Sequence, residues 1–349
     1  MRVIAFIIIF CTTYSCSTKS KLKEIEIDLS KYESIIDLHQ YSDSLKVVKL
    51  ETTEECLIGR IGRIIEDDSL LFLLDKQSKS ILVFHSSGRF SHSIYHEGKG
   101  NGDYLATKDI AVDKKRNVIY VYDDHTRQLI CYDYQGGFLR KVSLPDFLIR
   151  SFAIRENGNF LAFAPDLMSR MRDGVWEFDI NGNLISEYAD INENHKLAWT
   201  AYPYFTRIDE TYSYLNYYDN YIYTLDKDIL ARKLKVHIKQ KIPDKYVSNP
   251  EGVDETFTGE YYMPSSLNET DSFYHFRNTS FGREPGSIHV FIEKNSNQLI
   301  IADSLIYDFE DYRNIQKIFS NDGKNFIGLL ESNTSDNPAL VVFNLRSIQ

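Results

Sequence analysis

The chain has 349 residues, of which 43% are hydrophobic, 26% are charged and only 8 are proline, and this composition argues against a disordered protein. Its formal net charge is −10, which argues against a general nucleic-acid-binding protein because phosphate contacts need clustered Lys and Arg. The 24 Tyr and 21 Phe favour β-strands, because aromatic side chains pack well on a half-buried pleated surface. We therefore expect a folded, strand-rich protein that does not bind nucleic acid.

The N-terminus predicts export to the cell envelope. Arg2 precedes the apolar run VIAFIIIF and then CTTYSCS, a pattern typical of a secretory signal and too short to span a bilayer. Cys16 resembles the lipid-modified cysteine of a bacterial lipoprotein, with threonine three residues earlier where leucine is usual; the alternative is a plain cleaved signal. We expect a lipoprotein signal peptide over residues 1–15, a lipid-anchored tether and lead-in over 16–44, and attachment to a membrane, the outer one, through the lipid alone.

A strand-turn-strand phrase recurs three times after this leader. It reads ILVFHSSGRFSHSI, LICYDYQGGFLRKV and VWEFDINGNLISEY, and its turn glycines Gly88, Gly136 and Gly182 are 48 and 46 residues apart. The strand ends LLFLLD and VIYVYD also repeat at a spacing of 48 residues. Spacing in the forties with a β pattern is typical of the blades of a β-propeller. The repeat therefore predicts an all-β propeller of four-stranded blades over residues 45–349.

Continued along the chain, the repeat predicts six blades. Three regular blades are followed by a fourth that lacks the turn glycine but keeps four strands, from RID to ILARKLKVHI. A long insertion at about 243–285 precedes SIHVFIE and QLIIAD of the fifth blade, and IQKIFS, FIGLLE and ALVVFNL form the sixth. Because the sixth blade lacks one strand, LKVVKL at 45–50 is expected to complete it and close the ring, leaving only short, protected edges.

Several of these segments resemble a known family. SDSLKVVKLETTEECLIGRIGRI, LLFLLDKQSKSILVFHSSGRF and EGKGNGDY are similar to the six-bladed β-propeller lipoproteins of Bacteroidetes, which are distantly similar to NHL-repeat propellers. The resemblance implies the propeller fold and an envelope location, and it implies no established activity. The triplet Asp-Ser-Leu also resembles the acceptor pattern for protein O-glycosylation in these bacteria, which would place sugars on Ser44, Ser69 and Ser304, although Asp-Ser is also good turn chemistry.

A glycine-rich loop over residues 98–102 is one candidate binding site. It lacks the spacing and the Lys-Ser/Thr pair of a phosphate-binding P-loop, so its glycines are expected to allow positive φ in a long connection. Loops at a propeller mouth often bind ligands, and the polar side chains that could contact a ligand here are His96, Lys99, Asp103 and Tyr104.

The segment 249–285 is the second candidate, because loops on a rigid scaffold often carry specificity. Arg277, Phe281 and Arg283 are its candidate contacts for an anion or a carboxylate. The dense aromatic stretch over 202–223 could also stack on sugars, but alternation along strands predicts that about half of its members face the core.

Acidic clusters at Asp67-Asp68 and Asp123-Asp124-His125 have side chains that can ligate metals, yet Asp in turns more often caps backbone amides, and we expect that role. No HExxH or GxSxG motif is present, and no metal site or cofactor is predicted. Cys131, inside a strand, is expected to be a buried core residue, and a disulfide with Cys56 is left open.

These observations favour a non-catalytic binding or protein-interaction module whose partner is a glycan, a peptide or an envelope protein. The alternative is a metal-assisted propeller enzyme of the lyase or lactone-hydrolase type, which the resemblance to NHL-like propellers suggests. Such enzymes hold calcium or zinc on the propeller axis with ligands from several blades, so that no local motif would reveal the site. Whether the protein is an enzyme is left open at this point.

Overall fold

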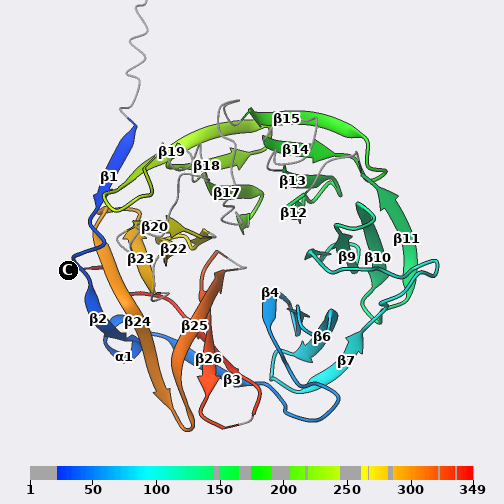
Figure 1. Cartoon of the computed structure of the whole chain (residues 1–349), viewed down its shortest axis with the longest axis horizontal. Helices are drawn as coiled ribbons and strands as arrows, with labels where there is room; N and C mark the ends of the chain where they lie inside the picture. Colours follow the sequence, from blue (N-terminus) through cyan, green and yellow to red (C-terminus); the bar gives the residue numbers. More distant parts are fainter. Residues whose placement is uncertain are drawn as a thin grey trace, which may run out of the picture.

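The structure is a computed structural model, and it describes residues 22–144, 149–164, 174–190, 205–216, 219–243, 261–265, 267–281, 286–320, 323–334 and 336–348. These residues form β-strands and one four-residue helix, α1 (Leu38–Tyr41). The strands make sheets that stand side by side around a central axis in a propeller-like arrangement (Figure 1). None of the helices in the described residues is long and apolar enough to cross a membrane.

The first half of the chain forms three antiparallel sheets of four strands, whose strands are neighbours in chain order. In each sheet the first strand lies nearest the axis and the last lies at the rim (Figure 1). The strands of the three sheets are β4 (Ile61–Asp67), β5 (Leu70–Asp75), β6 (Ser80–His85) and β7 (Phe90–Ile94); β8 (Asp109–Asp113), β9 (Val118–Asp123), β10 (Gln128–Asp133) and β11 (Phe138–Ser143); β12 (Ser151–Ile154), β13 (Phe160–Ala164), β14 (Gly174–Phe178) and β15 (Leu184–Asp190). The three sheets confirm the three regular copies of the repeat.

The repeated turn glycine is a steric requirement of this arrangement. Gly88 and Gly182 have φ values of 89° and 88°, in the left-handed region that side chains with a Cβ rarely adopt. A Cβ added to Gly88 would lie 1.8 Å from the carbonyl oxygen of Lys49, and one added to Gly182 would lie 2.2 Å from that of Ser143. Each turn therefore rests directly against the backbone of the strand that precedes its sheet.

The second half of the chain forms one five-stranded and one ten-stranded sheet. The five-stranded sheet contains β16 (Thr206–Ile208), β17 (Thr211–Asn216), β18 (Tyr221–Asp226), β19 (Ile229–Ile238) and, from the N-terminal region, β1 (Lys23–Ile27). The ten-stranded sheet contains β20 (Tyr261–Pro264), β21 (Asn268–Glu269), β22 (Phe273–Phe281), β23 (Ser287–Glu293), β24 (Leu299–Phe309), β25 (Tyr312–Ser320), β26 (Phe326–Ser332) and β27 (Ala339–Phe343), joined by β2 (Glu33–Asp37) and β3 (Leu45–Lys49). The four strands expected between 206 and 238 are confirmed.

Strand β3 pairs with β27, as the sequence predicted for the segment that includes it. The pairing is antiparallel, and it places Val47 opposite Val341 and Val48 opposite Leu340. Val48 and Leu340 then pack with Leu71 and Phe84 in one buried cluster, so the seam is apolar as well as hydrogen-bonded. The N-terminal strand therefore ties the last sheet to the first.

The structure corrects the predicted insertion at 243–285. Residues 261–264, 268–269 and 273–281 are strands, and β22 pairs with β23 from Phe273 to Thr279. In the sequence FYHFRNTSF, His275 and Asn278 are both buried, on opposite faces of the strand, so its pattern is carried partly by polar residues and shows no simple apolar alternation.

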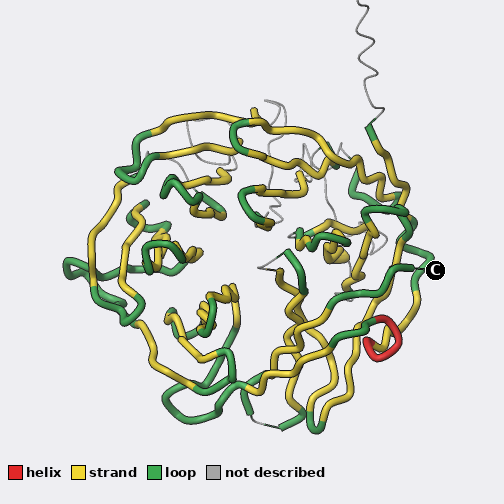
Figure 2. The backbone as a smooth tube through the Cα atoms, turned by 180° about the vertical axis from the view of Figure 1, so that it is seen from behind, coloured by secondary structure: helices red, strands yellow, loops and turns green. Residues whose placement is uncertain are grey.

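The lead-in segment is also part of the sheets. β1 runs parallel along β19 and β2 runs parallel along β24, with Ile25, Ile27 and Ile36 buried. Figure 2 shows α1, which follows β2, at the periphery of the molecule. These strands cover the outer edges of two sheets, which would otherwise present unpaired backbone groups.

The cysteines and the aromatic stretch have structural roles in the described residues. Cys131 is buried as expected, and Cys56 is buried too; both are free thiols. Tyr212, Tyr214 and Tyr223 are buried in the cluster between β12–β14 and β16–β18. The expectation that part of the aromatic stretch faces the core is therefore confirmed, while Tyr202, Tyr204, Tyr217 and Tyr218 lie outside the described residues.

We predict that replacing Val48 with Asp destabilises the whole domain, because it buries an unpaired carboxylate at the seam between β3 and β27. The expected loss is at least about 2 kcal/mol in the free energy of unfolding, measured by chemical denaturation. The matched control is Lys46→Asp, an exposed position of the same strand, which should change the value by less than about 0.5 kcal/mol. Equal effects of the two substitutions would contradict a stabilising seam.

Candidate functional site

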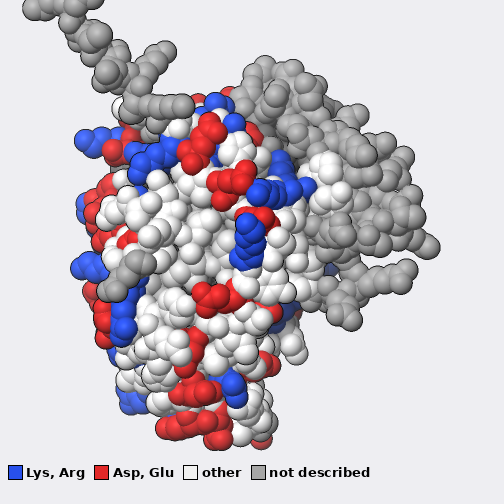
Figure 3. Space-filling model, turned by 90° about the vertical axis from the view of Figure 1, so that its left-hand side faces the viewer, with Lys and Arg blue, Asp and Glu red and all other residues white. Residues whose placement is uncertain are grey.

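A cavity of about 1120 Å³ lies at the axis, lined by residues from all five sheets. Among the described residues, its lining contains eleven Lys and Arg but only three acidic residues, Asp113, Glu156 and Asp209. The chain as a whole has the opposite balance, with a formal net charge of −10. Figure 3 shows one side of the outer surface, where acidic and basic side chains are mixed. Positive charge is therefore concentrated inside the molecule.

The innermost strands run in the same direction, so the cavity has two different ends. Arg63, near the start of β4, lies 3.5 Å from Asp109 at the start of β8, and Lys114, just after β8, lies 3.9 Å from Asp67 at the end of β4. Strand starts therefore meet at one end of the cavity and strand ends meet at the other. We call the first end the cationic mouth. Seven basic residues line it: Arg60, Arg63, Lys76, Lys108, Arg150, Arg277 and Lys317.

Backbone contacts place the cations from other strands at this same mouth. The amide of Lys76 donates to the carbonyl of Arg60, and Lys76 Nζ lies 2.7 Å from the carbonyl oxygen of Thr107. Lys317 Nζ, from β25, lies 2.7 Å from the carbonyl oxygen of Ile61. Arg277, from β22, donates to the carbonyl of Gln316, the neighbour of Lys317, at 3.3 Å. Segments far apart in the chain thus supply one group of charges.

The three lining acids described all lie at the opposite end, where the strands end, and three of the four cations there, Lys114, Arg155 and Arg207, have carboxylate partners. Arg155 Nη1 is 2.6 Å from a carboxylate oxygen of the buried Glu177 and 3.3 Å from one of Asp228. Arg207 pairs with Glu210 and with Glu156. Ion pairs therefore neutralise much of the positive charge at this end.

Several cations of the cationic mouth have no such partner. Within the described part of the chain, no carboxylate lies within 4 Å of the head groups of Arg60, Arg277 and Lys317; Arg63 and Lys108 do have carboxylates within this distance, Asp109 and Asp124. The Nε atom of Arg277 is buried and makes no hydrogen bond in that part of the chain. Arg277 and Lys317 instead donate to backbone carbonyls, those of Gln316 and Ile61.

The pKa values at the mouth record the cost of this arrangement. Burial lowers the pKa of Lys76 to about 8, partly opposed by the nearby Asp109 carboxylate. Burial also lowers the pKa of Lys317, and the positive charges of Arg277 and Arg60 lower it further. Partly desolvated cations that repel one another are stabilised when an anion enters between them, because the anion compensates for the lost solvation and reduces the repulsion. The mouth is therefore suited to bind negative charge.

Two buried histidines line the cavity beside Arg277. His275 Nδ1 lies 3.2 Å from Nδ2 of Asn268, and His275 Nε2 lies 3.0 Å from Nδ1 of His289. Burial, with the neighbouring Arg277 charge, lowers the pKa of His289 to about 3, and the pKa of His275 lies well below its usual value for the same reasons. Both rings are therefore neutral at physiological pH.

The sequence carried one signal for the mouth that its interpretation did not use. Arg60, Lys108 and Arg150 directly precede the innermost strands β4, β8 and β12, and they are 48 and 42 residues apart. A cation repeated at the same place in consecutive blades is therefore a signal that the interpretation of the repeat left out. Of the predicted site residues, Arg277 lines the cavity, whereas Arg283 and the side chain of Phe281 lie outside the described residues, as does Cys16.

The predicted loop around residues 96–104 lies apart from the cavity lining and packs against the sheet β8–β11. Tyr104 is fully buried, donates to the carbonyl of Lys79 at 2.7 Å and accepts from the amide of His96 at 3.1 Å. The ring of His96 stacks on Tyr132 at a centroid distance of 4.9 Å. Asp103 accepts from the amide of Gly100, and Lys99 is exposed. His96, Asp103 and Tyr104 thus hold the shape of the loop.

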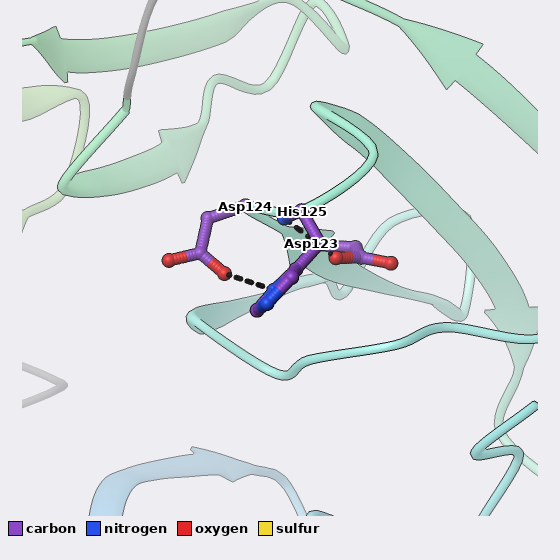
Figure 4. Close-up of side chains that lie close together, drawn as sticks. All are labelled: Asp123, Asp124 and His125. Atoms are coloured by element: carbon purple, nitrogen blue, oxygen red, sulfur yellow. Dashed lines mark hydrogen bonds and ion pairs between the residues drawn. The ribbon is translucent and has the colours of Figure 1, made fainter. Parts of the chain in front are cut away.

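The cluster Asp123-Asp124-His125 lies at the end of β9 and in the turn that follows it (Figure 4). Its potential ligand atoms lie within 4.8 Å of one another. However, the Asp123 carboxylate already accepts hydrogen bonds from the amides of Leu105, His125 and Thr126, and Asp124 lies 3.4 Å from His125 and 3.8 Å from Lys108. The expected capping role of Asp123 is confirmed.

Comparison with known proteins gives a family and a fold. A family model described as a domain of unknown function, DUF4934, matches residues 22–341. No curated protein matches the chain. A solved structure of a protein described as exported, from Bacteroides fragilis, superposes with a TM-score of 0.70 at 17% identity, covering 93% of this chain and 100% of the other.

Two further structures are less similar. A DUF4221 family member from Bacteroides vulgatus has a TM-score of 0.54 at 10% identity, covering 87% of this chain and 97% of its own. The protein U3-55K has a TM-score of 0.51 at 11% identity, covering 86% and 98%. At these identities the likeness shows the fold alone.

We predict that Tyr104→Phe destabilises the protein, because it leaves the buried amide of His96 and the carbonyl of Lys79 without their partner. The expected loss is about 1–3 kcal/mol in the free energy of unfolding, measured by chemical denaturation. Tyr95→Phe is the control, since the Tyr95 hydroxyl contacts only Glu97 at the exposed surface. A loss of ligand binding with unchanged stability would instead place Tyr104 in a binding site.

Proposed function

Because the chain belongs to the DUF4934 family, a domain of unknown function, we propose a function from its own lining: it is an exported, non-catalytic propeller module that binds an acidic oligosaccharide at the cationic mouth. The observation that carries the proposal is a pair of partly desolvated cations, Arg277 and Lys317, beside the exposed Arg60, all three without carboxylate partners in the described part of the chain. Charges held in this state cost stability unless a ligand neutralises them.

The dimensions of the mouth support a ligand with several charges. Its seven cations come from segments between residues 60 and 317, and the cavity volume of about 1120 Å³ far exceeds that of a single small anion. The lining also contains neutral groups that can bind hydroxyls, among them Ser265, Asn268 and Thr279. Acidic groups and hydroxyls on one chain are the chemistry of a carboxylated or sulfated glycan. Of the three expected kinds of partner, a glycan, a peptide or a protein, we therefore propose a glycan.

The metal-assisted lyase or hydrolase is less well supported. A divalent cation on the axis would be repelled by the cations of the mouth. His275 is committed to Asn268 and His289, and the lining acids at the other end include Glu156, which pairs with Arg207. The electrostatics of the lining therefore favour anion binding over metal-dependent catalysis.

The proposed architecture is a ring of six blades. The ten-stranded sheet is divided into two blades because β24 and β25 pair only at Ile306 with Asn314 and at Phe309 with Tyr312, near the hairpin that joins them. β3 then completes the sixth blade and closes the ring. We place this ring in the cell envelope, held at the outer membrane by a lipid on Cys16; the signal-like N-terminus and the likeness to an exported protein support this location.

We expect the protein to bind oligogalacturonate or heparin-derived oligosaccharides, but not neutral dextran oligosaccharides, when tested by calorimetry. Affinity should fall as salt is raised from 50 to 200 mM, because the interaction is electrostatic. Arg60→Gln should weaken binding by about tenfold, the value of one charge-assisted hydrogen bond.

The matched control for this experiment is Arg313→Gln, which removes a cation that pairs with Asp308 away from the cavity lining. Its affinity should equal that of the wild type. Binding of neutral dextran as tight as that of the acidic chains would contradict the proposal, and so would stronger binding of a DNA oligonucleotide of equal charge.

We also predict that binding weakens as pH rises from 7 to 9. Lys76 has a pKa of about 8, so it is charged below this pH and neutral above it, and its loss of charge removes attraction for the anion. The charged groups that act on Lys76 are Asp109, Lys108, Asp124 and Arg60. Lys76→Arg keeps its charge over this range, so its affinity should fall less. An identical pH profile for both proteins would exclude Lys76 from the site.

A further inference from the structure

The hydrogen-bond chain through the two histidines has a fixed direction. Asn268 Nδ2 lies 3.0 Å from the carbonyl oxygen of Ile318, which can only accept, so this end of the side chain is the amide NH₂ group. The same NH₂ group lies 3.2 Å from His275 Nδ1, which therefore accepts. The proton of neutral His275 is then on Nε2, and it is donated to Nδ1 of His289.

This direction makes His289 a hydrogen-bond donor at the cavity. Because Nδ1 of neutral His289 accepts from His275, its proton is on Nε2. Nε2 of His289 makes no hydrogen bond to the described residues, and the residue lines the cavity. Behind the pair, His275 packs against Phe291 and Phe326, with ring centroids at 4.5 and 6.0 Å, and this apolar backing keeps it neutral.

Arg277 and Lys317 supply the charge beside this donor. Arg277 is the direct cross-strand neighbour of His289 in the pairing of β22 with β23. Its buried Nε lacks a partner in the described part of the chain, and its Nη1 donates to the carbonyl of Gln316, the residue before Lys317. Arg277 therefore lies beside both residues, since His289 is its cross-strand neighbour and Lys317 follows the residue whose carbonyl it binds. All three offer donors.

We propose that Arg277, Lys317 and His289 form a subsite for a single carboxylate or sulfate group of the ligand, with the direction of the His275–His289 hydrogen bond fixed by Asn268. This inference rests on the proposed function, and it adds the position of one anionic group and the neutral donor that orients it. A planar guanidinium, an ammonium and an imidazole N–H together match the several acceptor oxygens of an oxyanion.

The subsite is tested with small probes on the full chain. Methyl glucuronide carries one carboxylate, a sulfated methyl galactoside carries one sulfate, and methyl glucoside carries neither. In ¹⁵N NMR of the histidine rings we expect both His275 and His289 to be neutral with the proton on Nε2, and the Nε2–H signal of His289 to shift on addition of an acidic probe. Of the two acidic probes, the one that gives the larger shift and binds more tightly shows whether the subsite prefers a carboxylate or a sulfate.

Two variants separate the donor from the charge. His289→Phe removes the donor but keeps an aromatic ring, and Arg277→Lys keeps the charge but removes the planar fork of donors. Each should weaken binding of the preferred acidic probe by about tenfold. Arg313→Gln should leave it unchanged, since Arg313 lies outside the cavity lining. If His289→Phe fails to fold, Arg277→Lys and the wild-type NMR titration still decide the question.

The outcomes distinguish this inference from the proposed function. Wild-type affinity for the acidic probes in both variants, or a His289 ring with its proton on Nδ1, would overturn the subsite even while acidic oligosaccharides still bind. Equal NMR shifts with methyl glucoside would overturn it too. Absence of binding by any acidic oligosaccharide to the wild type would overturn the proposed function and the subsite together.

Discussion

The pairing of β3 with β27 is the interaction on which the cavity depends. It brings the sheet that follows residue 60 against the last sheet of the chain, and both contribute to one buried apolar cluster. Across this seam Lys317 Nζ reaches the carbonyl of Ile61, so that Lys317 and Arg60 become neighbours although 257 residues separate them. Without the seam, the two sides of the cationic mouth would have no fixed relation.

The fold places charge in an unusual way for an acidic protein. Lys and Arg gather at one end of the axial cavity, while the acidic lining residues lie at the other end. A buried cation is usually stabilised by a carboxylate partner, as Arg155 is by Glu177. Their lowered pKa values mean that the folded chain holds Lys76 and Lys317 at a cost. A local departure from optimal stability of this kind is expected where a ligand binds.

The first three sheets could be predicted from the sequence, whereas β22 and the cavity lining could not. The strands of the first three sheets follow from alternation and from glycines such as Gly88, whose backbone conformation excludes other residues. β22 was missed because polar residues are buried on both of its faces, His275 on one and Asn278 on the other, and a polar residue is buried only where a partner such as Asn268 or Ile288 satisfies it. The sequence could not show that His96 and Tyr104 of the predicted binding loop have hydrogen-bond partners within the protein.

The sequence by itself determined the repeated unit, its turn chemistry and the strand that joins the two ends of the chain, because these follow from local periodicity and from steric limits on single residues. It also contained the cations at residues 60, 108 and 150, each directly before an innermost strand. Only the tertiary structure decided that these cations meet Arg277 and Lys317 at one end of a cavity and that His289 donates into it. Burial and the mutual repulsion of charges depend on distances between segments far apart in the chain, and those distances exist only once the sheets have assembled around the axis.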